Sequence, residues 1–177
     1  MGSFVSLAAG VVLLYWPYVW CWYRKEDEDD YGLRWDYDKR TILQTLLVSA
    51  IILALLTPAA LWWPWDELPH RRGALVVLKM LGSGLAAAII EETFFRGWVQ
   101  PMFRKVMPAA AAIVLTNCIF APIHLIAIPN PVSLTVFFPG LVMGALREKY
   151  GNVLPGMIFH FIGNIWAIWF FPAPINF

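Results

Sequence analysis

Charged side chains are scarce in this sequence. They account for 14% of its 177 residues, whereas apolar residues account for 60% and aromatic residues for 16%; an average soluble domain is closer to half apolar. Residues 2–23, 41–65 and 152–177 contain no Asp, Glu, Lys or Arg. Because a membrane-spanning helix needs about 20 apolar residues, each stretch is long enough to cross a bilayer. The shortage of charge therefore predicts an integral membrane protein.

Other features are missing as well. Only two cysteines are present, which implies no disulfide framework. A net charge of +1 gives no electrostatic basis for binding nucleic acid. The first apolar stretch has no basic segment ahead of it and no A-x-A site, and it is followed by Arg24 and Lys25. We therefore expect a retained membrane anchor and not a cleaved signal peptide.

The apolar runs and the polar segments between them predict an all-α fold, a polytopic transmembrane bundle of about six helices. The helices are expected at residues 3–23, 41–62, 73–104, 108–128, 132–147 and 153–171. We expect one integral domain with two parts: two N-terminal helices with their loops at residues 1–72, and a four-helix core at residues 73–177.

The distribution of basic residues predicts the orientation of this bundle. The loops at residues 24–40, 104–107 and 147–152 lie on one side and carry nine Lys or Arg residues, whereas the other side carries only Arg71 and Arg72. Because basic loops remain in the cytoplasm, we expect both termini to face away from it.

Two adjacent acids, Glu91 and Glu92, lie in a helix otherwise rich in Ala, Gly and Ile. Ionisable residues inside membrane helices are costly, so each is a candidate functional residue. Glu92 and Arg96 are four residues apart, share a helix face and are expected to pair. Glu91 points about 100° away from Glu92 and lacks that partner. A single structural ion pair would not need two acids.

A histidine on the next helix is expected to meet Glu91. His124 and Glu91 are equally far along the chain from the turn near residue 107. At about 1.5 Å per residue both lie ~24 Å from that turn, so antiparallel packing places them at the same depth. Asn117 precedes His124 by seven residues, shares its face, and is expected to support the site.

His160 and Asn164 form a second polar pair, on the last helix. Their spacing of four residues places both side chains on one face. Gly156 and Gly163 lie nearby and are expected to allow close approach of another helix. We therefore expect a shared polar pocket.

This set of residues suits hydrolysis of an amide bond. Glu91 and His124 can hold one water between them, and a carboxylate in such a site acts as a general base. His160 and Asn164 offer hydrogen-bond donors for the negative oxygen of a tetrahedral intermediate. No serine or cysteine stands at motif spacing from a histidine, so a covalent nucleophile is not expected.

Three motifs resemble those of one protease family. Glu-Glu-x-x-x-Arg at residues 91–96, Phe-x-x-x-His at 120–124 and His-x-x-x-Asn at 160–164 resemble, in the same order, the motifs of the CPBP family of CAAX proteases and bacteriocin-processing enzymes, also called the Abi family. The resemblance covers about residues 75–168. It implies water activation by Glu91 and His124, an oxyanion site at His160 and Asn164, and helix organisation by Glu92 and Arg96.

The resemblance also implies a metal-free, glutamic type of intramembrane endopeptidase without a cofactor. Its expected partners are the lipid bilayer and a membrane-anchored or lipid-modified substrate protein, cut at a CAAX-type end or at a C-terminal sorting signal. The expected location is the cytoplasmic membrane of a bacterium or archaeon. Only two predicted helices precede the core, which is few for the family and leaves less wall for a prenyl-peptide cavity.

Three other functions fit parts of the pattern. Glu91, His124 and His160 are candidate ligands of a zinc hydrolase with water as the fourth ligand, although the sequence has no His-Glu-x-x-His. A bacteriocin-immunity protein or another non-enzymatic membrane protein is the second alternative, and a small transporter or proton relay is the third. The complete set of Glu, His, His and Asn favours the peptidase.

Overall fold

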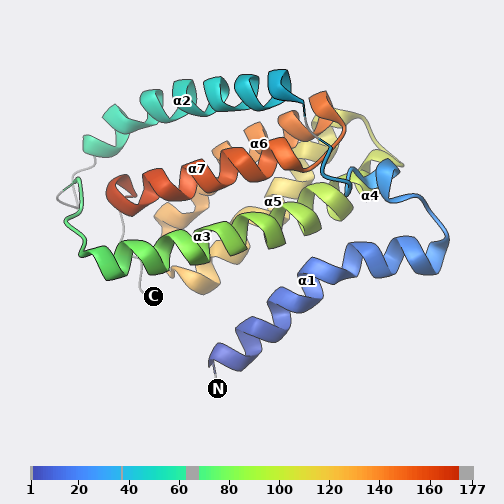
Figure 1. Ribbon diagram of the computed structural model, residues 1–177, viewed down its shortest axis with the longest axis horizontal. Helices are drawn as coiled ribbons and strands as arrows, with labels where there is room; N and C mark the ends of the chain where they lie inside the picture. The colour runs from blue at the N-terminus through green and yellow to red at the C-terminus, as the bar shows by residue number, and fades with distance from the viewer. Residues whose placement is uncertain (1, 37, 63–67, 172–177) are drawn as a thin grey trace.

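The computed structural model describes residues 2–36, 38–62 and 68–171, and within these ranges every regular element is a helix (Figure 1). In chain order the elements are α1 (Gly2–Arg24), η1 (Glu28–Tyr31), α2 (Lys39–Leu61), α3 (Ala74–Phe94), η2 (Phe95–Val99), α4 (Gln100–Arg104), α5 (Ala109–Ala127), η3 (Pro131–Val136), α6 (Phe137–Tyr150) and α7 (Leu154–Phe170). The predicted all-α fold is confirmed.

Helices α3 and α7 lie side by side in the middle of the bundle (Figure 1). Helix α1 packs on α3, and α2 packs on α7. Helix α6 contacts both α7 and α5, and the short α4 contacts α5. The four helices predicted to form the core are thus packed in the order α3, α7, α6 and α5, with α1 against α3 and α2 against α7.

The helices have the length and composition of membrane spans. Within the described residues, four are long and apolar enough to cross a bilayer: Phe4–Arg24, Lys39–Leu61, Ala74–Arg104 and Ala109–Ile126. Helices α6 and α7 are shorter, with 14 and 17 residues. Large apolar side chains such as Leu7, Leu43 and Leu55 are exposed on the outer helices, where they contact the lipid chains of a bilayer. The chain is an integral membrane protein.

The helix predicted at residues 73–104 is interrupted near its end. Residues Phe95–Val99 form a π-helical turn, in which the Gln100 N–H donates to the Phe95 carbonyl five residues back. Pro101 follows directly. A proline inside an α-helix clashes with the carbonyl four residues earlier, here that of Gly97, and the wider turn relieves this clash.

The helix predicted at residues 132–147 is also modified. Its first turn is a 3-10 helix, Pro131–Val136, capped by the Asn130 side chain, which accepts a hydrogen bond from the Val132 N–H. At the other end α6 continues to Tyr150 and stops at Gly151, whose φ is 72°. Glycine adopts this left-handed conformation without strain, so the helix ends one turn later than predicted.

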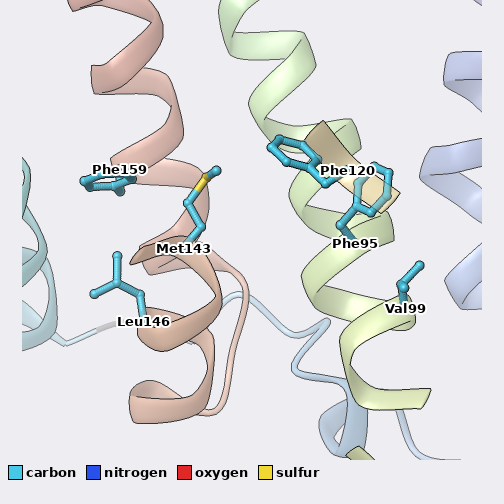
Figure 2. Close-up of a cluster of buried hydrophobic side chains, with 6 residues drawn as sticks. All are labelled: Phe95, Val99, Phe120, Met143, Leu146 and Phe159. Carbon is cyan, nitrogen blue, oxygen red and sulfur yellow. The ribbon is translucent and has the colours of Figure 1, made fainter. Parts of the chain in front are cut away.

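A cluster of buried apolar side chains joins the core helices. It consists of Phe95, Val99, Phe120, Met143, Leu146 and Phe159. Figure 2 shows Met143, Leu146 and Phe159 on one side of this cluster and Phe95, Phe120 and Val99 on the other. Burial of each contributes roughly 1.5–3 kcal/mol if exposure to water is the reference. This cluster fixes the positions of the polar residues on the same helices.

The loop after α1 is bound to the end of α4. The Lys105 ammonium contacts both the Glu26 carboxylate and the Tyr31 hydroxyl. A hydrogen bond from Tyr31, followed by one from Lys105, lowers the pKa of the Glu26 carboxyl. The loop thereby connects α1 to the core.

Candidate active site

Glu91 and Glu92 lie near the end of α3 and have different surroundings. The Glu92 side chain is fully buried, whereas that of Glu91 is 27% exposed. A Cβ atom at Gly156 of α7 would lie 2.8 Å from Glu92 Oε2. The glycine therefore lets α7 approach the buried carboxylate, as predicted for this position.

Arg96 is also fully buried and joins three helices. Its Nη1 donates to Glu92 Oε1 at 2.9 Å, and its Nη2 donates to Asn117 Oδ1 and to the Gly140 carbonyl, both at 3.0 Å. The guanidinium carbon lies 4.4 Å from the centre of the Phe120 ring. A Cβ at Gly140 would overlap Asn117 Oδ1, so a glycine is needed at this contact. The predicted ion pair between Glu92 and Arg96 is present.

His124 on α5 faces Glu91. Its Nε2 lies 3.8 Å from Glu91 Oε2. Its Nδ1 lies 3.1 Å from the Phe120 carbonyl oxygen. Because a carbonyl only accepts hydrogen bonds, Nδ1 carries a proton, and Nε2 presents its lone pair towards Glu91 when the ring is neutral.

His160 on α7 contacts both acids. Its Nδ1 lies 3.0 Å from Glu92 Oε1, and its Nε2 lies 3.9 Å from Glu91 Oε2. The ring also packs near Phe120, with the two ring centres 6.2 Å apart. His160 is thus connected to the Arg96 network through Glu92.

Asn164 lies one turn further along α7, on the same face as His160. Its Nδ2 donates to the Gly84 carbonyl of α3 at 2.9 Å, and a Cβ at Gly84 would lie 3.1 Å from Asn164 Cβ. The prediction for Gly163 is wrong, because no atom lies within 4 Å of the Cβ position there. Helix α7 approaches α3 at Gly84, and Gly163 borders a cavity instead.

That cavity has a volume of about 370 Å³ and lies between α2, α5, η3, α6 and α7. His124, His160 and Asn164 form its polar wall. The rest of its lining is mainly apolar: Leu53, Leu56, Ala59, Ala60, Phe120, Ile128, Val132, Val136, Phe138, Pro139, Met143, Phe159, Trp166, Ala167 and Phe171. The site therefore adjoins a chamber suited to an apolar ligand.

Gln100 is a buried polar residue that the sequence patterns did not single out. It donates to the Gly144 carbonyl at 3.1 Å and to Glu148 Oε1 at 2.9 Å. A spacing in the sequence points to this contact: Gln100 lies four residues after Arg96, just as Gly144 lies four residues after Gly140. Gln100 and Arg96 form parallel contacts to α6 and so fix that helix against α4 and η2.

The central feature of the site is one oxygen of Glu91. Glu91 Oε2 is buried and has no hydrogen-bond partner among the described residues. The two histidine nitrogens facing it, at 3.8 and 3.9 Å, are too far for direct hydrogen bonds. The two rings therefore converge on Glu91 Oε2 without bonding to it directly. In the described part of the chain, no group of three or more His, Cys, Asp or Glu side chains is arranged to hold a metal ion.

Comparison with known proteins gives a family. The family model described as Rce1-like, type II CAAX prenyl endopeptidase, matches residues 73–166. This range is just over half of the chain and contains the polar residues of the site, whereas the part of the cavity lining contributed by α2 lies outside it. No curated protein and no solved structure matches the chain.

Proposed function

Because the chain belongs to the Rce1-like family of type II CAAX prenyl endopeptidases, we propose that it hydrolyses a peptide bond in a membrane-anchored or lipid-modified protein by a glutamic mechanism. Family membership makes it a CAAX-type membrane endopeptidase; the mechanism and the substrate are our proposal. The observation that carries it is the convergence of His124 Nε2 and His160 Nε2 on Glu91 Oε2.

The nucleophile in this mechanism is a water held between Glu91 Oε2 and His124 Nε2. As the water oxygen bonds to the carbonyl carbon of the substrate, its proton passes to the Glu91 carboxylate. The C–N bond then breaks, and Glu91 gives the proton to the leaving amine. The products are a carboxylic acid and an amine, and Glu91 is again ionised.

His160 and Asn164 donate to the oxygen that becomes negative in the tetrahedral intermediate. Both lie on the wall of the cavity. One hydrogen of Asn164 Nδ2 goes to the Gly84 carbonyl, which fixes the amide and leaves the second hydrogen for the substrate. His160 is held from behind by Glu92. This support of both donors favours a pre-organised oxyanion site.

The cavity supports an apolar substrate. A lipid group or the apolar side chains of a membrane segment fit against its mainly apolar lining, at about 25 cal/mol for each Å² removed from water. The polar wall at one side then receives the peptide bond. Helix α2 borders the cavity and packs mainly on α7, so a route for the substrate from the bilayer lies beside α2.

The decisive experiment replaces Glu91. We predict that Glu91→Gln abolishes turnover of a peptide ending in a prenylated CAAX sequence by the purified enzyme in lipid nanodiscs. The amide keeps the shape of the side chain and cannot accept the proton from water. Asn164→Ala lowers kcat by roughly a hundredfold to a thousandfold, as loss of one oxyanion donor does.

Ser83→Ala is the matched control. Ser83 lies two turns before Glu91 on α3 and bonds to the Met80 carbonyl of its own helix, so this variant should keep normal activity. If Glu91→Gln retained near-normal turnover, the glutamic mechanism would be wrong.

A further inference from the structure

The Glu92 carboxylate contacts a second residue besides Arg96, the ring of His160. Its Oε1 accepts from Arg96 Nη1 at 2.9 Å and lies 3.0 Å from His160 Nδ1. An ionised carboxylate has no proton to give, so Nδ1 carries the hydrogen of the second bond. Arg96 is itself fixed by Asn117 and by the Gly140 carbonyl. Glu92 therefore contacts a residue of the oxyanion site from a rigid position.

This contact limits what His160 can do with its other nitrogen. A neutral imidazole with its proton on Nδ1 has only a lone pair at Nε2, and a lone pair cannot stabilise a negative oxygen. Nε2 faces Glu91 Oε2, and the His160 residue lines the cavity. His160 can donate there only when both ring nitrogens are protonated.

The charges around His160 favour this second proton. The titratable groups facing the ring are Glu91 and Glu92 from α3 and His124 from α5, with Arg96 behind Glu92. The lining residues contributed by α2, η3 and α6 are uncharged. Two carboxylates and one guanidinium leave one unbalanced negative charge, which is costly inside a membrane protein. One further proton makes the cluster neutral.

We propose that Glu92 is a positioning residue that keeps His160 doubly protonated, with Nε2–H directed at the oxyanion. Glu92 thus acts in the reaction through His160 in addition to its ion pair with Arg96. The hydrogen bond at Nδ1 orients the ring, and the carboxylate balances its charge. The effect of Glu92 on catalysis rests on the proposed function. The protonation of His160 does not, because it is a property of the protein without substrate.

The first test measures that resting state directly. In protein labelled with ¹⁵N-histidine and embedded in lipid nanodiscs at neutral pH, His160 should give the ¹⁵N signals of a ring protonated at both nitrogens, assigned by their loss in His160→Gln. His124 should show a neutral ring with its proton on Nδ1. A His160 ring with a bare nitrogen would overturn the proposal. The result does not depend on activity or on any Glu92 variant folding.

The second test measures turnover. Glu92→Gln keeps the side-chain shape and removes the charge, so kcat should fall by about a hundredfold with little change in KM, and the His160 signals should change to those of a neutral ring. Glu92→Asp retains the carboxylate and should recover at least part of the lost kcat. A normal kcat in folded Glu92→Gln would overturn the proposal.

Gln100→Leu is the control for a purely structural loss. Gln100 is another buried polar residue of the same helical segment, but it contacts α6 and not the histidines. This variant should lower thermal stability and leave kcat unchanged. If Glu91→Gln stayed active while His160 was doubly protonated, the glutamic mechanism would fail and the charge arrangement would stand, so the two failures are distinguishable.

Discussion

Adjacent carboxylates on α3 acquire different properties from their neighbours. Glu92 is enclosed by Arg96, His160 and the close approach of α7 at Gly156. Glu91 is partly exposed and faces two histidines, but neither ring donates a direct hydrogen bond to its Oε2. Glu92 is thus held by a direct hydrogen bond from the Arg96 guanidinium, whereas no such bond reaches Glu91 Oε2. This difference is why the proposed mechanism assigns the proton transfer to Glu91.

Removal of Arg96 should affect stability first. Arg96→Met leaves the buried Glu92 carboxylate without its guanidinium partner, and breaking a buried pair in this way costs about 3–5 kcal/mol. We expect a large drop in the thermal unfolding temperature in detergent and a low yield. The double variant Glu92→Met with Arg96→Met should recover part of that stability, because no charge is left unpaired. A stable Arg96→Met protein that cut different sequences would instead place Arg96 in substrate binding.

Metal dependence distinguishes the glutamic mechanism from the zinc alternative, in which Glu91, His124 and His160 are ligands. We predict that EDTA and 1,10-phenanthroline leave turnover unchanged. The measurement is activity before and after chelation, with the metal content of the purified protein determined in parallel. Stoichiometric zinc, loss of activity on chelation and recovery with added zinc would establish the alternative.

At the scale of helices, glycines on α6 let the polar network form. A Cβ at Gly140 would overlap Asn117 Oδ1 and lie 3.1 Å from Arg96 Nη2. Gly140→Ala should therefore destabilise the protein by about 1–3 kcal/mol, measured as thermal unfolding in detergent. Gly82→Ala on α3 is the matched control, because no atom lies within 4 Å of that Cβ position; it should be neutral or slightly stabilising. Equal effects of the two changes would contradict this assignment.

Much of the helical arrangement was predictable from the apolar runs and from spacings along the chain. The four-residue spacing predicted the pair of Glu92 and Arg96, and equal distance from a turn predicted that Glu91 and His124 meet. The π-helical turn was not predictable in this way, since hydrophobic content is the same in either kind of helix. The bonds of Asn164 to Gly84 and of His160 to Glu92 depend on how α7 packs against α3, which no local pattern specifies.

For the whole molecule, the expected orientation of both termini away from the cytoplasm stays a prediction, and so does its division into two N-terminal helices and a core. The packing of α2 beside the cavity nevertheless indicates what kind of substrate the site favours. The cavity is mainly apolar and adjoins α2 at the periphery of the bundle. A substrate that brings apolar groups from the bilayer gains affinity that a soluble peptide lacks.

We therefore predict that kcat/KM depends on a membrane anchor. A peptide with a prenyl group or an apolar segment beside the cleaved bond should be cut more than about tenfold faster than the same peptide without it, because even two buried methylene groups contribute about 1.6 kcal/mol. The measurement compares both peptides in nanodiscs at matched concentrations. Equal cleavage of the soluble peptide would contradict a lipid-facing substrate route.

The π-helical turn has a consequence for the angular phase of the polar residues. Glu92, Arg96, Gln100 and Arg104 follow one another at intervals of four. In an α-helix of 3.6 residues per turn, each such step overshoots a full turn by about 40°, so three steps would rotate Arg104 about 120° away from Glu92. A π turn of about 4.4 residues undershoots by about 30° over the same step. Deleting one residue from 97–99 would remove this correction and turn Gln100 and Arg104 by about 100° away from Gly144 and Glu148, although the motif at residues 91–96 would be intact.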